Sequence, residues 1–304
     1  MAILGMSAAP ASLAALLVLG LGAGGASAAQ LLPHRAVYDL ALDQATQTDF
    51  DSIDGRIVVE ITQRSCEAYE LDYRFVARFL TDRELTVVDQ HIELEEPVEG
   101  ESLRFSSKST VDGLGEQASA GTATTRDGRT QVDYREPDER DVDIPAAAFP
   151  IAHTRNLIDA ARSGAFVYET AIFDGDAEAE KETRSTSIIA SLAAPGGSQA
   201  TADETAVAEE RQEDGPAGKE REGTPAEDSA GARALRDHER WRVSEAYYDK
   251  TGSADGAPDF TTSYTLYDNG VSDDLTMNFD GYSLTGSMSE FTPLGAEDCK
   301  PSER

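Results

Sequence analysis

Short runs that alternate between apolar and polar residues dominate the chain from Leu31 onward. In DYRFVARFL, for example, Tyr73, Phe75 and Phe79 fall on one face and Arg74 falls on the other, which predicts a half-buried β-strand. Similar runs are HRAVYDLAL, GRIVVEITQ, ELTVVDQHIEL, ESLRFSSKST, RTQVDYRE, GAFVYETAIF, TSIIASL, RWRVSEAYY, TTSYTLYDNG, DLTMNFDG and YSLTGSMSEF. Asn-Gly and Asp-Gly pairs in the connections favour tight hairpins. We therefore predict a mainly β protein with one large antiparallel sheet, which must curl, close or double up to hide its edges.

One segment has helical spacing instead. In FPIAHTRNLIDAARSG, Leu157, Ile158 and Ala161 recur at the period of a helix, a proline precedes the first turn, and Gly164 provides a C-terminal stop. We predict one structural helix over roughly 151 to 163. It should pack across the sheet or plug the open end of a barrel.

The segment from about 195 to 237 lacks aromatic residues and any large apolar run, and it is rich in Ala, Gly, Glu and Asp. It cannot bury enough apolar area to offset the entropy of ordering it, so we predict a disordered acidic insertion between two strands. An acidic interaction tether is the functional alternative.

The first 29 residues carry no charged side chain, contain the apolar stretch LAALLVLGLGAG and end in small residues. This pattern predicts a secretory signal peptide that is cleaved after Ala28 or Ala29. An uncleaved anchor is the alternative, because no Lys or Arg precedes the apolar stretch. The expected product is an exported chain of one domain, 30 to 304, that does not span a membrane.

Charge narrows the range of partners. The formal net charge is −31, so nucleic acid and anionic membrane surfaces would be repelled, and a basic partner is favoured. Because 39% of the residues are hydrophobic, the chain can still build a sizeable core.

Candidate chemistry is sparse. The four histidines lie in separate segments, and none has a second His or Cys at metal-ligand spacing. They are His34, His91, His153 and His238. A structural role is favoured for His91, in an expected strand, and for His153, at the start of the helix. Without a nucleophile elbow, a phosphate-binding loop or a zinc-protease motif, we expect neither an enzyme nor a cofactor or metal.

The two cysteines are Cys66 and Cys299. An exported protein with two cysteines most often joins them in one disulfide. Such a bond would close a loop of roughly 230 residues, for which chain entropy gives about 5 kcal/mol as an upper figure. A catalytic thiol is the alternative, but the acidic neighbours Glu67, Glu297 and Asp298 would raise a thiol pKa.

Several segments together resemble the envelope integrity protein B family of exported Gram-negative proteins. The matching segments are LLPHRAVYDLAL, GRIVVEITQRSCEAYELDYRF, FPIAHTRNLIDAARSGAFVYETAIFDG, RWRVSEAYYDK and SYTLYDNGVSDDLTMNFDGYSLTGSMSEFTPL. The resemblance implies a periplasmic sheet curled into an open, spiral-like barrel with one helix, and a disulfide that maps onto Cys66 and Cys299. It also implies maintenance of the envelope under stress without enzymatic activity, with a periplasmic protein partner such as a helical-repeat protein. The chain departs from the family at DAEAEKETRSTSI and in the length of its acidic insertion.

Three functional hypotheses follow. The first is a non-enzymatic periplasmic scaffold or adaptor, whose open sheet edge adds a strand from a partner protein. The second is a carrier that holds a lipid or acyl chain inside the curled sheet. The third, a hydrolase of envelope polymers, is disfavoured because no nucleophile or acid/base pair stands out. The sequence sets neither the partner nor the oligomeric state.

Overall fold

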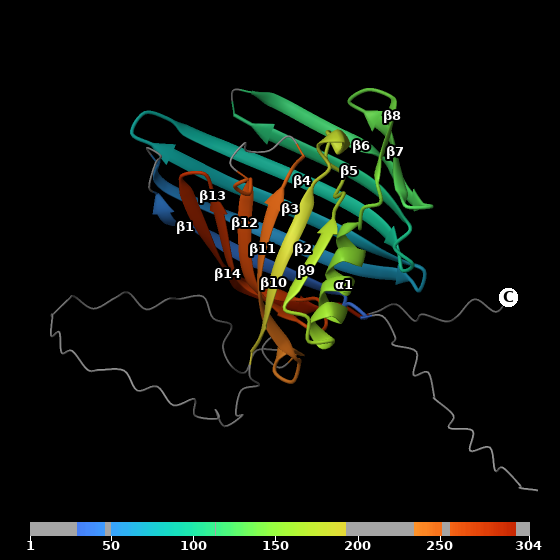
Figure 1. Cartoon of the computed structure of the whole chain (residues 1–304). Helices are drawn as coiled ribbons and strands as arrows, with labels where there is room; N and C mark the ends of the chain where they lie inside the picture. The colour runs from blue at the N-terminus through green and yellow to red at the C-terminus, as the bar shows by residue number, and fades with distance from the viewer. Residues whose placement is uncertain (1–28, 46–49, 113, 193–233, 251–255, 296–304) are drawn as a thin grey trace, which may run out of the picture.

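The computed structural model describes residues 29–45, 50–112, 114–192, 234–250 and 256–295 (Figure 1). The strands are β1 (His34–Ala45), β2 (Phe50–Ser65), β3 (Ala68–Thr81), β4 (Leu85–Pro97), β5 (Ser102–Val111), β6 (Gly115–Arg126), β7 (Arg129–Glu136), β8 (Arg140–Pro145), β9 (Val167–Ala171), β10 (Arg184–Ser191), β11 (Arg240–Tyr248), β12 (Phe260–Tyr267), β13 (Ser272–Phe279) and β14 (Tyr282–Pro293). The helices are α1 (Pro150–Arg162) and the short 3₁₀ turn η1 (Ala179–Lys181).

All the strands belong to one antiparallel sheet in the order β8-β7-β6-β5-β4-β3-β2-β1-β14-β13-β12-β11-β10-β9. The sheet curls around its own inner face, so that β8 and β9 form the two sides of an open seam (Figure 1). This arrangement confirms the predicted fold class. Within the described residues, no helix combines the length and the apolar composition that a membrane crossing requires.

Short segments that follow the edge strands partly bridge the seam. The amide of Ala148 donates to the carbonyl of Ala171 at 2.8 Å, and the amide of Phe173 donates to the carbonyl of Ala148 at 3.0 Å. Phe173 is also buried against Phe105, with the two rings edge to face at 5.3 Å. A second contact joins Arg140 of β8 to Glu180 and to the carbonyl of Ala177, in the segment that follows β9. The edges are therefore bridged at two places without forming a ladder.

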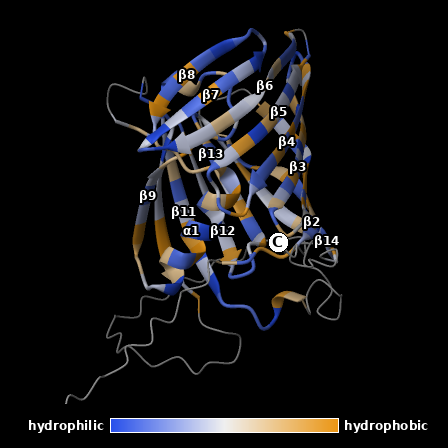
Figure 2. Ribbon diagram, turned by 90° about the vertical axis from the view of Figure 1, so that its right-hand side faces the viewer, coloured by the Kyte–Doolittle hydropathy of each residue, from blue (hydrophilic) through white to orange (hydrophobic). Residues whose placement is uncertain are grey.

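Helix α1 lies inside the curl next to β9, as both ribbon views show (Figures 1 and 2). Its bounds agree with the prediction to one residue, and Gly164 has the positive φ of +79° that a helix stop favours. The apolar face of the helix, with Leu157 and Ile158, packs among residues from both walls, including Ile61 and Trp241. The helix therefore occupies the interior at the end of the curl where β2 ends and β11 begins.

The predicted insertion lies outside the described residues except for its last four. Among these four, Leu235 is buried against Tyr267 and Val271. Leu235 therefore belongs to the core, although the insertion was predicted to extend to 237.

Candidate functional site

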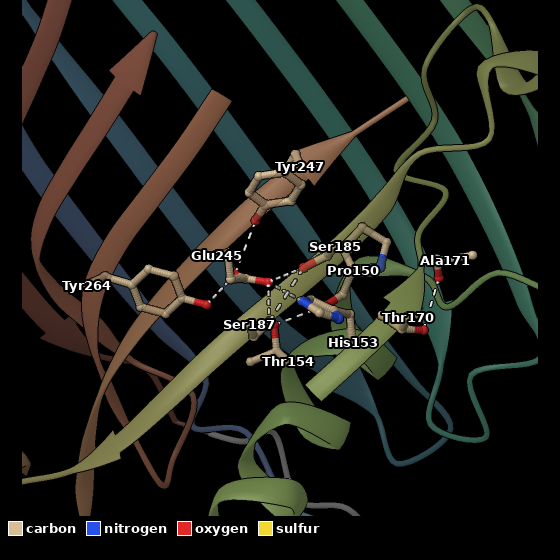
Figure 3. Close-up of polar contacts among 10 residues, drawn as sticks. All are labelled: Pro150, His153, Thr154, Thr170, Ala171, Ser185, Ser187, Glu245, Tyr247 and Tyr264. Carbon is tan, nitrogen blue, oxygen red and sulfur yellow. Dashed lines mark hydrogen bonds and ion pairs between the residues drawn. The ribbon is translucent and has the colours of Figure 1, made fainter. Parts of the chain in front are cut away.

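A buried carboxylate lies where α1 meets β10, β11 and β12 (Figure 3). Oε1 of Glu245 accepts hydrogen bonds from Nε2 of His153 at 2.9 Å, from Oγ of Ser185 at 2.7 Å and from Oγ of Ser187 at 3.0 Å. Oε2 accepts from the hydroxyls of Tyr264 at 2.5 Å and Tyr247 at 3.1 Å. Both carboxylate oxygens are thus fully engaged at a residue that is only 3% exposed.

The five donors decide the charge of Glu245. Burial alone would raise its pKa, but the hydrogen bond and charge interaction with His153, together with the hydroxyl donors, hold the pKa at about 2. Because the serines donate to the carboxylate, the group differs from a catalytic triad, in which the serine donates to the histidine. We interpret it as a connection that fixes α1 to the wall of the curl.

A second buried carboxylate fixes the other side of the helix. Glu96 on β4 accepts from the backbone amides of Ile151 at 2.8 Å and Ala152 at 2.7 Å, in the first turn of α1. The N-cap residue Phe149 makes no side-chain capping bond, so Glu96 takes that part. Burial raises the pKa of Glu96 to about 7, although these amides and the charge of Arg155 favour the carboxylate.

An arc of aromatic rings lines the inner face beyond the buried network, beginning at Tyr247, whose hydroxyl donates to Glu245. Tyr247 stacks on Phe260 with centroids 4.3 Å apart, Phe260 on Phe279 at 6.1 Å, and Phe279 on Tyr282 at 4.9 Å. Phe50 continues the arc, edge to face with Tyr282 at 5.4 Å. These residues come from five strands, and each is partly exposed.

The stacked geometry determines what the arc can contact. The faces of Phe260 and Phe279 are turned toward neighbouring rings, which leaves ring edges for the lumen. Ring edges form an apolar wall suited to a hydrocarbon chain. They offer less to a sugar, which stacks on a ring face.

An apolar patch covers the outside of the seam at β9 and β10. Val167 and Ile188 are directly opposite each other, with exposed fractions of 48% and 46%. Phe166 and Leu192, at the ends of these strands, are also exposed. Four of the seven large apolar residues that the described chain exposes therefore gather at one edge of the sheet.

The structure separates the four histidines. His34 is buried, its Nδ1 lies 2.7 Å from the carbonyl oxygen of Leu32, and burial lowers its pKa. His91 lies on the outer face of β4 with Nε2 3.1 Å from Oδ1 of Asp72, and His238 pairs with Asp268. His153 alone enters the buried network, and its Nδ1 has no hydrogen-bond partner among the described residues.

The predicted disulfide remains a prediction. Cys66 lies in the turn between β2 and β3, while Cys299 lies outside the described residues. The predicted cleavage site is described on one side only, since Ala28 also lies outside the described residues. Ala29 is buried and its carbonyl accepts from Nε of Arg155 at 2.7 Å, so cleavage after Ala28 would keep this contact and cleavage after Ala29 would remove it.

Sequence reasoning did not identify Glu245, Glu96 or the aromatic arc. A signal for Glu245 was present: in RWRVSEAYY it shares a face with Trp241, Val243 and Tyr247. A carboxylate on the apolar face of a strand indicates a buried, hydrogen-bonded group. The arc had no local signal, since its rings come from strands far apart in the sequence.

Comparison with known proteins places the chain in a family. The EipB-like family model matches residues 25–214 and 214–295. The chain is 32% identical over 269 residues to the cell envelope integrity protein EipB of Brucella abortus (strain 2308), covering 88% of this chain and 85% of the relative. It is also similar to the crystal structure of a beta-barrel-like protein of a domain of unknown function from Brucella abortus, with a TM-score of 0.71 and 27% identity over 88% of this chain and 100% of that one. The chain belongs to the EipB-like family.

Proposed function

We propose that this chain is a non-enzymatic periplasmic protein that supports the integrity of the cell envelope by binding a partner protein at the edge of its sheet. The envelope role is supported by the name of the relative, a cell envelope integrity protein. The adaptor mechanism is supported by one observation, the exposed apolar patch beside the open strand β9.

The backbone of β9 offers hydrogen-bonding groups on its free side. The amide of Ile189 donates to the carbonyl of Phe166, and the amide of Ile172 donates to the carbonyl of Thr183, both at 2.9 Å. Because antiparallel strands alternate their bonding direction, Val167 and Glu169 turn their amides and carbonyls away from β10. Within the described chain, these groups have no partner on that side. An added strand could pair with them.

The patch also indicates which side chains a partner strand would carry. A strand added to β9 would place every second side chain in the row that contains Val167 and Ile188, where aliphatic groups would bury exposed apolar surface. The formal net charge of −31 favours basic residues at the other positions. The expected partner therefore contributes an extended segment with alternating aliphatic and basic side chains.

Proline substitution tests this mode directly. Glu169→Pro removes one amide from the free side of β9 and keeps the ladder to β10, whereas Glu169→Ala keeps the amide. After crosslinking mass spectrometry in the native periplasm has identified a partner, its binding to the purified variants is measured. We expect Glu169→Ala to bind like the wild type and Glu169→Pro to lose at least about tenfold in affinity. Equal binding of both variants would refute strand addition at this edge.

A carrier of a lipid or acyl chain is the second candidate, and the aromatic arc is the observation that favours it. Its ring edges form an apolar wall on the inner face of the curl. Lipid extraction of the purified protein followed by mass spectrometry tests this function. The carrier hypothesis expects acyl lipid in a fixed ratio to protein. The ratio should fall in Phe260→Ser but not in Leu114→Ser, which changes an exposed leucine that is not part of the arc. Protein free of lipid after gentle purification would contradict it.

A further inference from the structure

Three metal-ligating side chains come together on the outer face of β3 and β4. Asp72, His91 and Glu93 each offer a ligand atom, and these atoms lie within 4.8 Å of one another. Nε2 of His91 already lies 3.1 Å from Oδ1 of Asp72. All three side chains are accessible from solvent.

The sheet register holds the three residues in place. Asp72 and Glu93 are directly opposite each other, and His91 precedes Glu93 by two positions on the same face of β4. On the other face of the same strands, Leu94 is buried and Leu71 and Ile92 pack against the core. The backbone that carries the ligands is therefore fixed, and only side-chain rotations are needed to bring the ligand atoms closer.

The charges around this group are unbalanced. Glu60 on β2 is opposite Asp72, so Glu60, Asp72 and Glu93 place three carboxylates in one row across neighbouring strands. Like charges directly opposite each other destabilise a sheet. Arginines compensate the row only in part. Nε of Arg35 lies 3.9 Å from Oε2 of Glu60. Arg74 acts on Asp72 through its charge, while its guanidinium binds both carboxylate oxygens of Asp89 at 3.1 and 2.7 Å.

Glu93 is the least satisfied member of the row. Among the side chains that the structure describes, none forms a hydrogen bond or ion pair with its carboxylate. Together with Glu60 and Asp72 it lines an open groove of about 460 Å³. An ion can reach the carboxylates of Asp72 and Glu93 from this groove, and the ligand atom of His91 lies within 4.8 Å of theirs.

We propose that Asp72, His91 and Glu93 form a binding site for a divalent first-row transition metal ion of the Zn²⁺ class. One imidazole nitrogen and two carboxylate oxygens make up a ligand set that Zn²⁺ accepts, whereas Mg²⁺ and Ca²⁺ favour oxygen ligands alone. The fourth position is open to water or to a ligand atom from another molecule. Because Lys108 is opposite His91 on β5, its positive charge weakens the site, and we expect micromolar affinity.

Calorimetric titration of the mature protein with Zn²⁺ alone tests the site, after removal of any affinity tag. We expect one Zn²⁺ per chain at micromolar affinity, with a loss of more than about tenfold in both His91→Ala and Asp72→Asn. His238→Ala is the matched control, because His238 also pairs with an aspartate, the half-buried Asp268, but belongs to no three-ligand group among the described residues. This variant should bind like the wild type.

Two results would overturn the proposal. One is wild-type affinity in His91→Ala, and the other is displacement of Zn²⁺ by millimolar Mg²⁺, which would show general attraction to an acidic surface. Circular dichroism confirms that the variants are folded. Because β3 and β4 are separated from β9 by several strands in the sheet order, His91→Ala should bind the protein partner of β9 as the wild type does.

Discussion

Replacement of Glu245 by glutamine removes the charge from the buried network and keeps its shape. The carboxylate accepts five hydrogen bonds and donates none. An amide places two N–H groups toward hydroxyls that now act as donors. We expect Glu245→Gln to lower the free energy of unfolding by about 3 kcal/mol, a large part of the 5–15 kcal/mol that is usual for a domain.

Two routes give this magnitude. Hydrogen bonds to a charged group stabilise by roughly 1.5–3 kcal/mol and neutral ones by about 0.5–1.5, so each of the three bonds at Oε1 loses about 1 kcal/mol. The hydroxyls of Tyr247 and Tyr264 can rotate and accept from the amide. Independently, the pKa of Glu245 falls from the usual 4.5 to about 2, which corresponds to about 3 kcal/mol of stabilisation of the folded charged form.

Urea unfolding followed by tryptophan fluorescence measures the effect, because Trp241, the single tryptophan of the chain, is buried on the same strand. Ser244→Ala is the matched control: this neighbouring residue is exposed on the outer face, where its hydroxyl contacts Ser263 at 2.8 Å. The control should change stability by less than about 0.5 kcal/mol. An equally small change in Glu245→Gln would refute the reasoning.

The same variant makes a pH prediction. Since the folded pKa of Glu245 lies below its unfolded value, its stabilisation is complete above about pH 4.5 and is lost as the pH falls toward 2. The difference in unfolding free energy between wild type and Glu245→Gln should therefore shrink between pH 5 and pH 2. A difference that stays constant over this interval would show that the charge of Glu245 does not stabilise the fold.

Three further predictions concern other parts of the chain. Burial raises the pKa of Glu96 to about 7, so its contribution to stability is greatest below about pH 4.5 and declines as the pH rises through 7. In urea titrations between pH 5 and 8, Glu96→Gln should therefore lose up to about 3 kcal/mol less unfolding free energy than the wild type. Gly270→Ala should lower the free energy of unfolding in urea by about 2–3 kcal/mol, because φ is +86° and the new Cβ would lie 2.6 Å from the side chain of Leu31. Its control, Gly128→Ala, has a φ of +77° and open space around it and should cost about 1 kcal/mol. Cys66→Ser and Cys299→Ser should each lower the melting temperature and speed proteolysis, and equal stability of oxidised and reduced protein would contradict the predicted disulfide.

The fold was predictable because its signals are local. Alternation of apolar and polar residues marks most strands, and the helix between Pro150 and Gly164 has its own period, start and stop. Among the described strands, every ladder except the one between β1 and β14 joins strands that are consecutive in the chain, although β10 and β11 pair across residues 192–239. Patterning therefore predicted a curled antiparallel sheet, but not the position of its seam, which depends on the pairing of β1 with β14.

The candidate sites were less predictable, because each assembles residues that are distant in the sequence. His153 and Glu245 are separated by 92 positions, and Glu96 and Ile151 by 55. The metal-ligating group joins Asp72 with the His-x-Glu pair of the next strand, and nothing local to either segment points to the other. Only the sheet register brings such residues together.

The ladder between β1 and β14 also has a consequence for how the molecule folds. It pairs His34 with Pro293, whereas all other ladders join strands that are consecutive in the chain. The described strands therefore form two meanders, β1–β8 and β9–β14, joined by the ladder between β1 and β14. The first is built from local contacts, whereas the second contains the longer-range ladder between β10 and β11. Closing the ladder between β1 and β14 carries the largest loop entropy and should limit the folding rate. Since the break in the sheet falls between β8 and β9, fragments separated at the start of α1 would retain complete meanders and could reassemble along β1 and β14.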